Sequence, residues 1–130
     1  RVVDATIPAE LGGWWLLIRT AKEAAGDGER LIKALGALAN EIAIPRWTIL
    51  VGQDAATTDE ILFHWLAHSS PDRDRFISVC GRRIAFDATP KVRGDERLGL
   101  PVRDWPPIIR TSPDMLARIR QRRAELGLEI

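Results

Sequence analysis

The feature that most constrains the fold is an alternation of short apolar runs with helical patterns. Trp14–Arg19 follows two glycines and is typical of a buried strand, and Trp47–Val51 is a β-branched and aromatic run that ends at Gly52. Between them, apolar residues recur every three or four positions from Leu31 to Ile42, which predicts an amphipathic helix. Because strands that alternate with helices form parallel pairs with helices against the sheet, this order predicts an α/β fold.

The second half of the chain continues the alternation. Thr57 and Glu60 form a capping-box pattern that starts a second helix, and short strands are predicted at Phe76–Val79 and Arg83–Asp87. A helix after each of the first two strands predicts helices packed on a largely parallel sheet.

The C-terminal third contains clear breaking and capping residues. Four of the eight prolines lie within Ala88–Thr111, so we expect an irregular segment there. Ser112 as N-cap and Pro113 as first helical residue then predict a terminal helix, Ser112–Leu126, that ends before Gly127. We expect residues 1–130 to form a single domain, because 45% apolar residues suffice for one core in a chain of 130 residues.

Composition excludes several classes of partner. The 19 basic and 18 acidic residues nearly cancel, so no overall field favours nucleic acid or an anionic membrane. The longest apolar run, Trp14–Ile18, is far shorter than the roughly 20 residues of a membrane-spanning helix. A single cysteine, Cys80, allows no internal disulfide, and we therefore expect a cytoplasmic protein. The chain begins at Arg1 and its one methionine is Met115, so we expect it to be part of a longer polypeptide.

Three local patterns carry possible chemistry, and each has a simpler interpretation. His64 and His68 lie four residues apart as paired zinc ligands do, but Trp65 occupies the place of the metalloprotease glutamate, which favours ordinary helix histidines and no metal. Cys80 has arginines nearby that would lower a thiol pKa, yet no base accompanies it, so a structural cysteine is favoured. The acidic residues after Gly52 could hold a cation, although helix capping is the simpler role. These acidic residues are Asp54, Asp59 and Glu60.

Five segments in order resemble the C-terminal domain of the UbiD decarboxylase family. They are TIPAELGGWWLLIR (Thr6–Arg19), PRWTILVGQD (Pro45–Asp54), DEILFHWLAHSSPDRD (Asp59–Asp74), RRIAFDATPK (Arg82–Lys91) and RDWPPIIRTSPDMLARIRQRRAELGL (Arg103–Leu128). The fourth contains the D-A-T motif of the family, and the fifth resembles its closing W-P and S-P motifs and last helix. One departure is the short segment between Asp74 and the D-A-T motif, where many members carry a long loop.

The resemblance implies a three-layer α/β/α sandwich with a mostly parallel sheet. It also implies that this sandwich is a domain of a carboxy-lyase that acts on an aromatic or α,β-unsaturated carboxylic acid. The complete enzyme would use prenylated FMN with a divalent cation and potassium, held by the preceding domains, so no catalytic residue and no cofactor is expected in this chain alone. The expected partner is the remaining domains or a large subunit, in a homo- or hetero-oligomer. The alternative is a stand-alone binding or assembly module with the same fold.

Two sets of residues take roles from the resemblance. The pocket-lining candidates are Asp4, Thr6, Ile7 and Pro8. The interface candidates on the last helix are Met115, Arg118, Ile119, Arg122 and Leu126. The sparse apolar stripe of that helix among arginines also favours a contact with another chain rather than RNA, since no aromatic residue is interleaved with the arginines.

Overall fold

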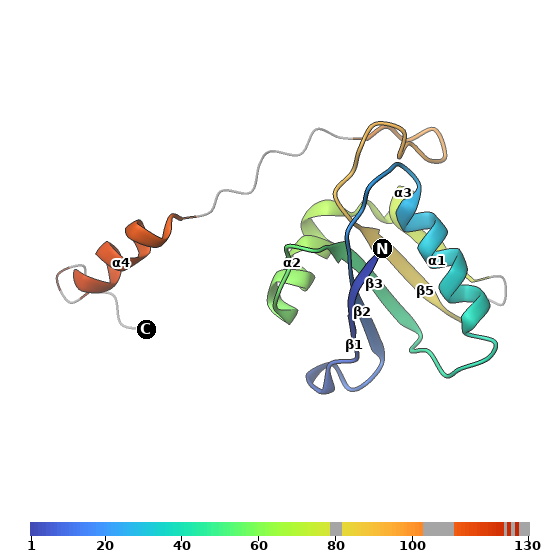
Figure 1. The fold of residues 1–130 in the computed structure, drawn as a ribbon, viewed down its shortest axis with the longest axis horizontal. Coiled ribbons are helices and arrows are strands. Elements are labelled where there is room, and N and C mark those ends of the chain that lie inside the picture. Colours follow the sequence, from blue (N-terminus) through green and yellow to red (C-terminus); the bar gives the residue numbers. More distant parts are fainter. Residues whose placement is uncertain (79–81, 103–110, 124, 126, 128–130) are drawn as a thin grey trace.

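The computed structural model describes residues 1–78, 82–102, 111–123, 125 and 127. A five-stranded sheet in the order β1-β2-β3-β5-β4 forms its centre (Figure 1). The strands are β1 (Val2–Thr6), β2 (Trp15–Thr20), β3 (Trp47–Gly52), β4 (Arg75–Ile77) and β5 (Ile84–Ala88). The helices are η1 (Ala9–Leu11), α1 (Asp27–Leu38), α2 (Thr58–His68), α3 (Pro71–Asp74) and α4 (Pro113–Gln121).

The sheet is mixed, so the prediction of a mostly parallel sheet is wrong. The pairs β2–β3 and β3–β5 are parallel, whereas both edge strands, β1 and β4, pair antiparallel with their neighbours. Each edge strand is joined to its neighbour by a connection too short for a crossover, which forces the antiparallel direction. The edge strand β1 was not predicted from the sequence. All five of its residues are exposed, so no alternation of apolar and polar residues indicates a buried face.

Side chains that alternate along β3 divide between the two faces of the sheet. Ile49 and Val51 belong to the core that α2 covers through Ile61, and both strand residues are fully buried. Thr48 faces the other side, where it lines a cavity with α1. Helices therefore lie on both faces of the sheet (Figure 1).

Helix α1 covers its face of the sheet only partly. A cavity of about 680 Å³ remains between α1, β4 and β5, and its apolar lining includes Ile32, Leu35, Phe76 and Ile84. The predicted three-layer sandwich is therefore not confirmed in full.

The N-caps of α2 and α4 are the ones that the sequence predicts. The capping box of α2 is present as predicted, because Thr57 Oγ1 accepts from the Glu60 N–H at 3.2 Å and Glu60 Oε2 accepts from the Thr57 N–H at 3.1 Å. Ser112 caps α4 through the Met115 N–H, also as predicted.

The predicted extension of the terminal helix to Leu126 is wrong within the described residues, since α4 ends at Gln121 and Leu126 itself lies outside them. Every residue of α4 is exposed, so no packing extends the helix beyond its local propensity. Residues 89–102, the described start of the predicted irregular segment, contain one isolated bridge, Arg97–Leu100.

Candidate functional site

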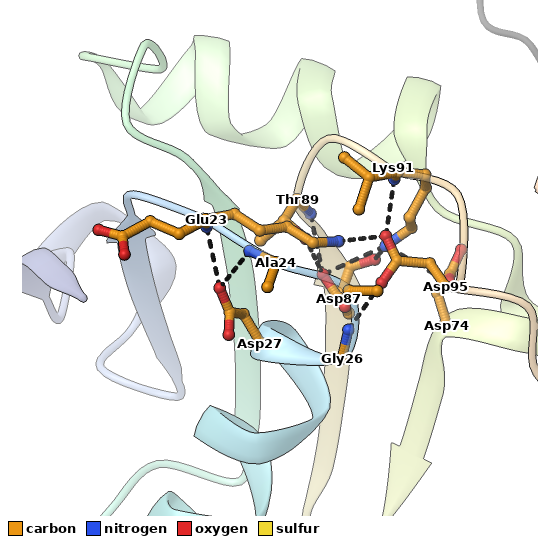
Figure 2. Close-up of polar contacts among 12 residues, drawn as sticks. Glu23, Ala24, Gly26, Asp27, Asp74, Asp87, Thr89, Lys91 and Asp95 are labelled. Carbon is orange, nitrogen blue, oxygen red and sulfur yellow. Dashed lines mark hydrogen bonds and ion pairs between the residues drawn. The ribbon is translucent and has the colours of Figure 1, made fainter.

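A cluster of buried charges lies at the carboxyl ends of the central strands (Figure 2). We call it the ionic cluster, and it consists of Lys22, Arg73, Asp74, Asp87, Lys91 and Asp95. Asp87 lies on β5, where its Oδ1 accepts hydrogen bonds from the backbone N–H of Thr89 at 3.0 Å and from its hydroxyl at 2.5 Å. The D-A-T motif therefore forms a closed turn that fixes the Asp87 carboxylate.

Lys91 joins two carboxylates of the ionic cluster. Its side chain is 2% exposed, and its Nζ lies 3.2 Å from Oδ1 of Asp87 and 3.4 Å from Oδ1 of Asp74. Arg73 holds Asp74 from the other side with two parallel hydrogen bonds, Nε to Oδ1 at 2.9 Å and Nη2 to Oδ2 at 2.8 Å. The two ion pairs of Lys91 connect α3 to the end of β5.

The remaining pair ties the loop after β2 to the segment after β5. Lys22 Nζ lies 2.5 Å from Oδ2 of Asp95, and both side chains are less than a tenth exposed. Asp95 also accepts from the backbone N–H groups of Gly26 at 2.9 Å and Val92 at 2.7 Å. Two segments that are distant in the sequence, 22–26 and 92–95, thus meet at one carboxylate.

The start of α1 adds a further polar contact beside the cluster. Asp27 Oδ2 accepts from the backbone N–H groups of Glu23 at 2.9 Å and Ala24 at 2.8 Å (Figure 2). These two hydrogen bonds lower the pKa of the Asp27 carboxyl to about 2. The turn that leads into α1 is therefore held by a carboxylate that stays ionised at neutral pH.

The surroundings of Asp74 and Asp95 keep both carboxylates charged. Burial alone would raise their pKa values, but the hydrogen bonds from Arg73 to Asp74 and from Lys22 to Asp95 outweigh it. Backbone N–H groups and the nearby cationic charges act in the same direction. The net result is a pKa below the ordinary 3.8 for both groups.

The ionic cluster should make the fold sensitive to acid. A carboxylate whose pKa is lowered on folding stabilises the protein above its unfolded pKa of about 3.9, and this contribution is lost as the pH falls through the folded pKa. We therefore expect the urea midpoint to be nearly constant from pH 7 to 5 and to fall below about pH 4. Asp95→Asn should lower the midpoint at pH 7 and show a smaller further fall between pH 5 and 3, since one titrating group is gone. An unchanged acid response in this variant would contradict the role of Asp95.

The geometry of the ionic cluster supports a structural role. Each of its three cations lies within ion-pair distance of a carboxylate, so none of the pairs offers a free base, nucleophile or anion-binding cation. Across the described ranges, no group of three or more His, Cys, Asp and Glu residues is placed to hold a metal ion. The cluster therefore locks the ends of β5, α1 and α3 in place.

The two histidines of α2 lie side by side. The rings of His64 and His68 are perpendicular with centroids 4.8 Å apart, and His64 is 3% exposed. Burial lowers the pKa of His68, and the charges of His64 and Lys91 add to this effect against that of Asp54. No third metal ligand joins the pair among the described residues. Cys80, for which a structural role was favoured over a reactive one, lies outside the described residues.

The pocket-lining candidates lie along one edge of the sheet. Asp4 and Thr6 are on β1, where Asp4 Oδ2 lies 3.2 Å from Nη2 of Arg19 and accepts from the Thr6 hydroxyl at 3.4 Å. Ile7 is 51% exposed, whereas Pro8 is buried and precedes η1. The structure thus brings Asp4, Thr6 and Ile7 together on the surface and places Pro8 inside.

The interface candidates lie on α4 and are exposed where described. Met115, Arg118 and Ile119 belong to the helix, and Arg122 at its end forms an ion pair with Glu125 at 2.8 Å. Leu126 lies outside the described residues. No helix in the described part of the chain is long and apolar enough to cross a membrane.

Sequence reasoning did not single out Lys22, Arg73 or Asp95. The pair Lys22–Asp95 joins residues 73 positions apart, so no local spacing marks it. The D-A-T motif pointed to this region through Asp87 and Thr89, and the family-like segment Asp59–Asp74 contains Asp74.

Comparisons with known proteins agree with the fold. The family described as "3-octaprenyl-4-hydroxybenzoate carboxy-lyase C-terminal domain" matches residues 1–97. Among solved structures, the UbiD-class enzyme HmfF from Pelotomaculum thermopropionicum is 19% identical with a TM-score of 0.60, covering 77% of this chain and 23% of its own. The closed form of vanillic acid decarboxylase from Sedimentibacter hydroxybenzoicus is 14% identical with a TM-score of 0.64, covering 98% and 29%.

A third solved structure, 3,4-dihydroxybenzoic acid decarboxylase (AroY) from Klebsiella pneumoniae, is 15% identical with a TM-score of 0.55, covering 90% of this chain and 28% of its own. No curated protein matches the chain. The chain spans less than a third of the length of these solved enzymes. With the family matched over three quarters of its residues and the α/β fold shared, this chain belongs to the UbiD C-terminal domain family.

Proposed function

We propose that this chain is the C-terminal domain, or an equivalent small subunit, of a UbiD-type carboxy-lyase acting on an aromatic or α,β-unsaturated carboxylic acid. The family match over residues 1–97 carries the proposal. Two of the structural neighbours are named for aromatic carboxylic acids, vanillic acid and 3,4-dihydroxybenzoic acid. The reaction itself belongs to the complete protein, which works in the cytoplasm.

The cofactor of the complete enzyme is, in this proposal, prenylated FMN with a divalent cation and potassium. HmfF was solved with prenylated FMN and with FMN, which supports this assignment. The cations of the ionic cluster do not fit a flavin phosphate, because Lys22, Arg73 and Lys91 already face carboxylates. We therefore assign the flavin, the metals and the catalytic residues to the rest of the enzyme.

This chain contributes to the wall of the substrate pocket through the end of β1. The edge strand exposes every residue and so leaves its outer side open to a neighbouring domain. Arg19 holds the Asp4 carboxylate in place, and the exposed Ile7 follows directly. Asp4, Thr6, Ile7 and Pro8 together form a short segment with one fixed charge and one apolar side chain.

The second role of the chain is assembly through α4. Its exposed apolar residues include Met115 and Ile119, and Ile119 lies between Arg118 and Arg120. A helix of this kind completes its burial against another chain. The partners are the remaining domains or large subunit and further copies of the enzyme.

Reconstitution tests the proposal. The chain is mixed with the remaining polypeptide and prenylated FMN, and release of carbon dioxide from vanillic acid and 3,4-dihydroxybenzoic acid is measured. We expect a stable complex whose turnover is lost when this chain is omitted. In the complex, Ile7→Ala should raise KM by about fivefold to a hundredfold, since it removes three carbon groups and each buried one in a pocket contributes up to about 1 kcal/mol, while the exposed control Val92→Ala should not.

Two results would count against this function. Turnover by the isolated chain would place catalytic residues within it. A folded chain that associates with no flavin-binding polypeptide would favour the stand-alone module.

A further inference from the structure

Small residues on both sides leave the cavity between α1, β4 and β5 open, and we call it the α1 cavity. On the sheet, Thr48, Ala85 and Phe76 pair across β3, β5 and β4, so they lie in one row on the same face. All three line the cavity, and the small side chain of Ala85 leaves its floor low. Gly36 lines the cavity from α1. The resulting volume of about 680 Å³ lies in the range of small-molecule sites.

The packing around Gly36 does not require a glycine. A Cβ at this position would meet no described atom within 4 Å beyond its chain neighbours and the nearby backbone of its own helix. A glycine inside a helix is nevertheless less favourable than an alanine, because it loses more backbone entropy on folding. A residue that weakens its helix without a packing reason fits a cavity that stays open for a ligand.

A buried hydroxyl faces the α1 cavity. Thr48 lines the cavity and is 6% exposed, and its hydroxyl forms no hydrogen bond within the described part of the chain. Ile49 and Val51 belong to the core on the α2 side, so alternation along β3 directs Thr48 to the α1 side. A buried polar group without a partner is costly, and a polar atom of a ligand would satisfy it.

Two arginines line the α1 cavity, and neither lies within ion-pair distance of a carboxylate among the described residues. Arg97 is already engaged, because its Nη1 donates to two backbone carbonyl groups and its Cζ lies 3.8 Å from the centre of the Phe76 ring. Arg83 donates only from Nη2, to the carbonyl of Ala39 at 3.3 Å. Its Nε and Nη1 have no acceptor within the described ranges, so this guanidinium can bind an anion.

Arg83 and Thr48 lie at the same end of the α1 cavity. Arg83 precedes Ala85 by two positions, and Ala85 pairs with Thr48, so alternation places both side chains on the α1 side. A carboxylate at this end would accept hydrogen bonds from the Arg83 guanidinium and from the Thr48 hydroxyl. An apolar body would then extend along α1 from Ala39 to Ile32, a length of about 10.5 Å at 1.5 Å per residue.

We propose that the α1 cavity binds a carboxylate with a long apolar chain, whose head group is held by Arg83 and Thr48. The apolar walls and the volume fit a long chain, since a single aromatic ring would leave most of the cavity empty. This site goes beyond the proposed function. It lies beside β4 and β5, whereas the proposed pocket wall lies at β1, on the opposite edge of the sheet.

Isothermal titration calorimetry of the whole 130-residue chain with decanoate tests the proposal. We expect saturable binding of one decanoate per chain with a dissociation constant of about 10–100 μM. Decanol has the same apolar chain without the charge and should bind at least about tenfold more weakly, and decyltrimethylammonium should not bind saturably. No saturable binding of decanoate up to about 1 mM, or equal binding of all three amphiphiles, would overturn the inference.

Two neighbouring arginines test the head-group contact. Arg83→Gln should weaken decanoate binding about tenfold or more and leave decanol binding unchanged, since it removes only the charge that the carboxylate meets. Arg82→Gln is the matched control, because Arg82 is exposed and does not line the cavity, and it should bind decanoate like the original chain. Equal losses in the two variants would overturn the assignment of the head group to Arg83.

Filling the cavity tests the site independently of charge. Gly36→Leu should weaken decanoate binding at least about tenfold without lowering the urea midpoint, because leucine favours a helix and its side chain enters the open space. Ala37→Leu is the control, since Ala37 is exposed and lies outside the cavity, and its affinity for decanoate should not change. A folded Gly36→Leu chain that binds decanoate as tightly as the original would refute the proposed site.

Discussion

Gly28→Ala is expected to lower the free energy of unfolding by about 3 kcal/mol, although alanine favours helices. A Cβ at Gly28 in α1 would overlap all three atoms of the Asp87 carboxyl group. That carboxylate cannot turn aside, because Thr89 and Lys91 hold it from two sides. The new methyl group must therefore push α1 off the sheet or break the ionic cluster, and urea unfolding followed by circular dichroism measures the loss.

Gly36→Ala is the control in the same helix. Among the described residues, no atom outside its chain neighbours and the nearby backbone of its own helix lies within 4 Å of a Cβ at Gly36. This variant should stabilise the protein by about 0.5–1 kcal/mol, because alanine loses less backbone entropy in a helix than glycine. Equal and small effects of the two substitutions would show that α1 does not approach Asp87 as closely as described.

Lys91→Met is expected to cost about 3–5 kcal/mol of stability. The Nζ of Lys91 lies between the carboxylates of Asp74 and Asp87 and is almost completely buried. Without it, two buried negative charges face each other with Arg73 alone to compensate, while methionine fills most of the same volume. The urea midpoint at pH 7 measures the loss.

Lys33→Met is the control that separates the stability lost in Lys91→Met from the effect of removing any lysine charge. Lys33 also pairs with a carboxylate four positions earlier, Glu29, but its side chain is 72% exposed. A surface pair of this kind contributes about 0.5 kcal/mol or less, so this variant should be close to neutral. Adding Asp87→Asn to Lys91→Met should recover part of the lost stability, since one uncompensated charge is removed. A Lys91 variant as stable as the Lys33 variant would contradict the buried ionic cluster.

The resemblance to the UbiD family could be recognised from segments of sequence because those segments are local. The capping box at Thr57 and Glu60 satisfies backbone N–H groups within four residues, and the run from Thr48 to Val51 is buried on both faces of the sheet. Both features follow from residues close together in the chain. They were therefore predictable, and the structure confirms them.

Other features depended on partners distant in the sequence. The antiparallel edge strand β1 has no buried face of its own and forms by pairing with β2. The terminal helix ended earlier than its pattern indicated because no packing supports its last turn.

By itself, then, the amino-acid sequence determined the central parallel strands, the starts of α2 and α4, and the family, since periodicity and capping act over a few residues. Only the tertiary structure decided the mixed direction of the sheet and the ionic cluster. The physical reason is that both features join residues far apart in the sequence. Lys22 pairs with Asp95, and Gly28 lies against Asp87, only in the folded chain. Burial then strengthens the Lys22–Asp95 ion pair, which no local spacing indicates.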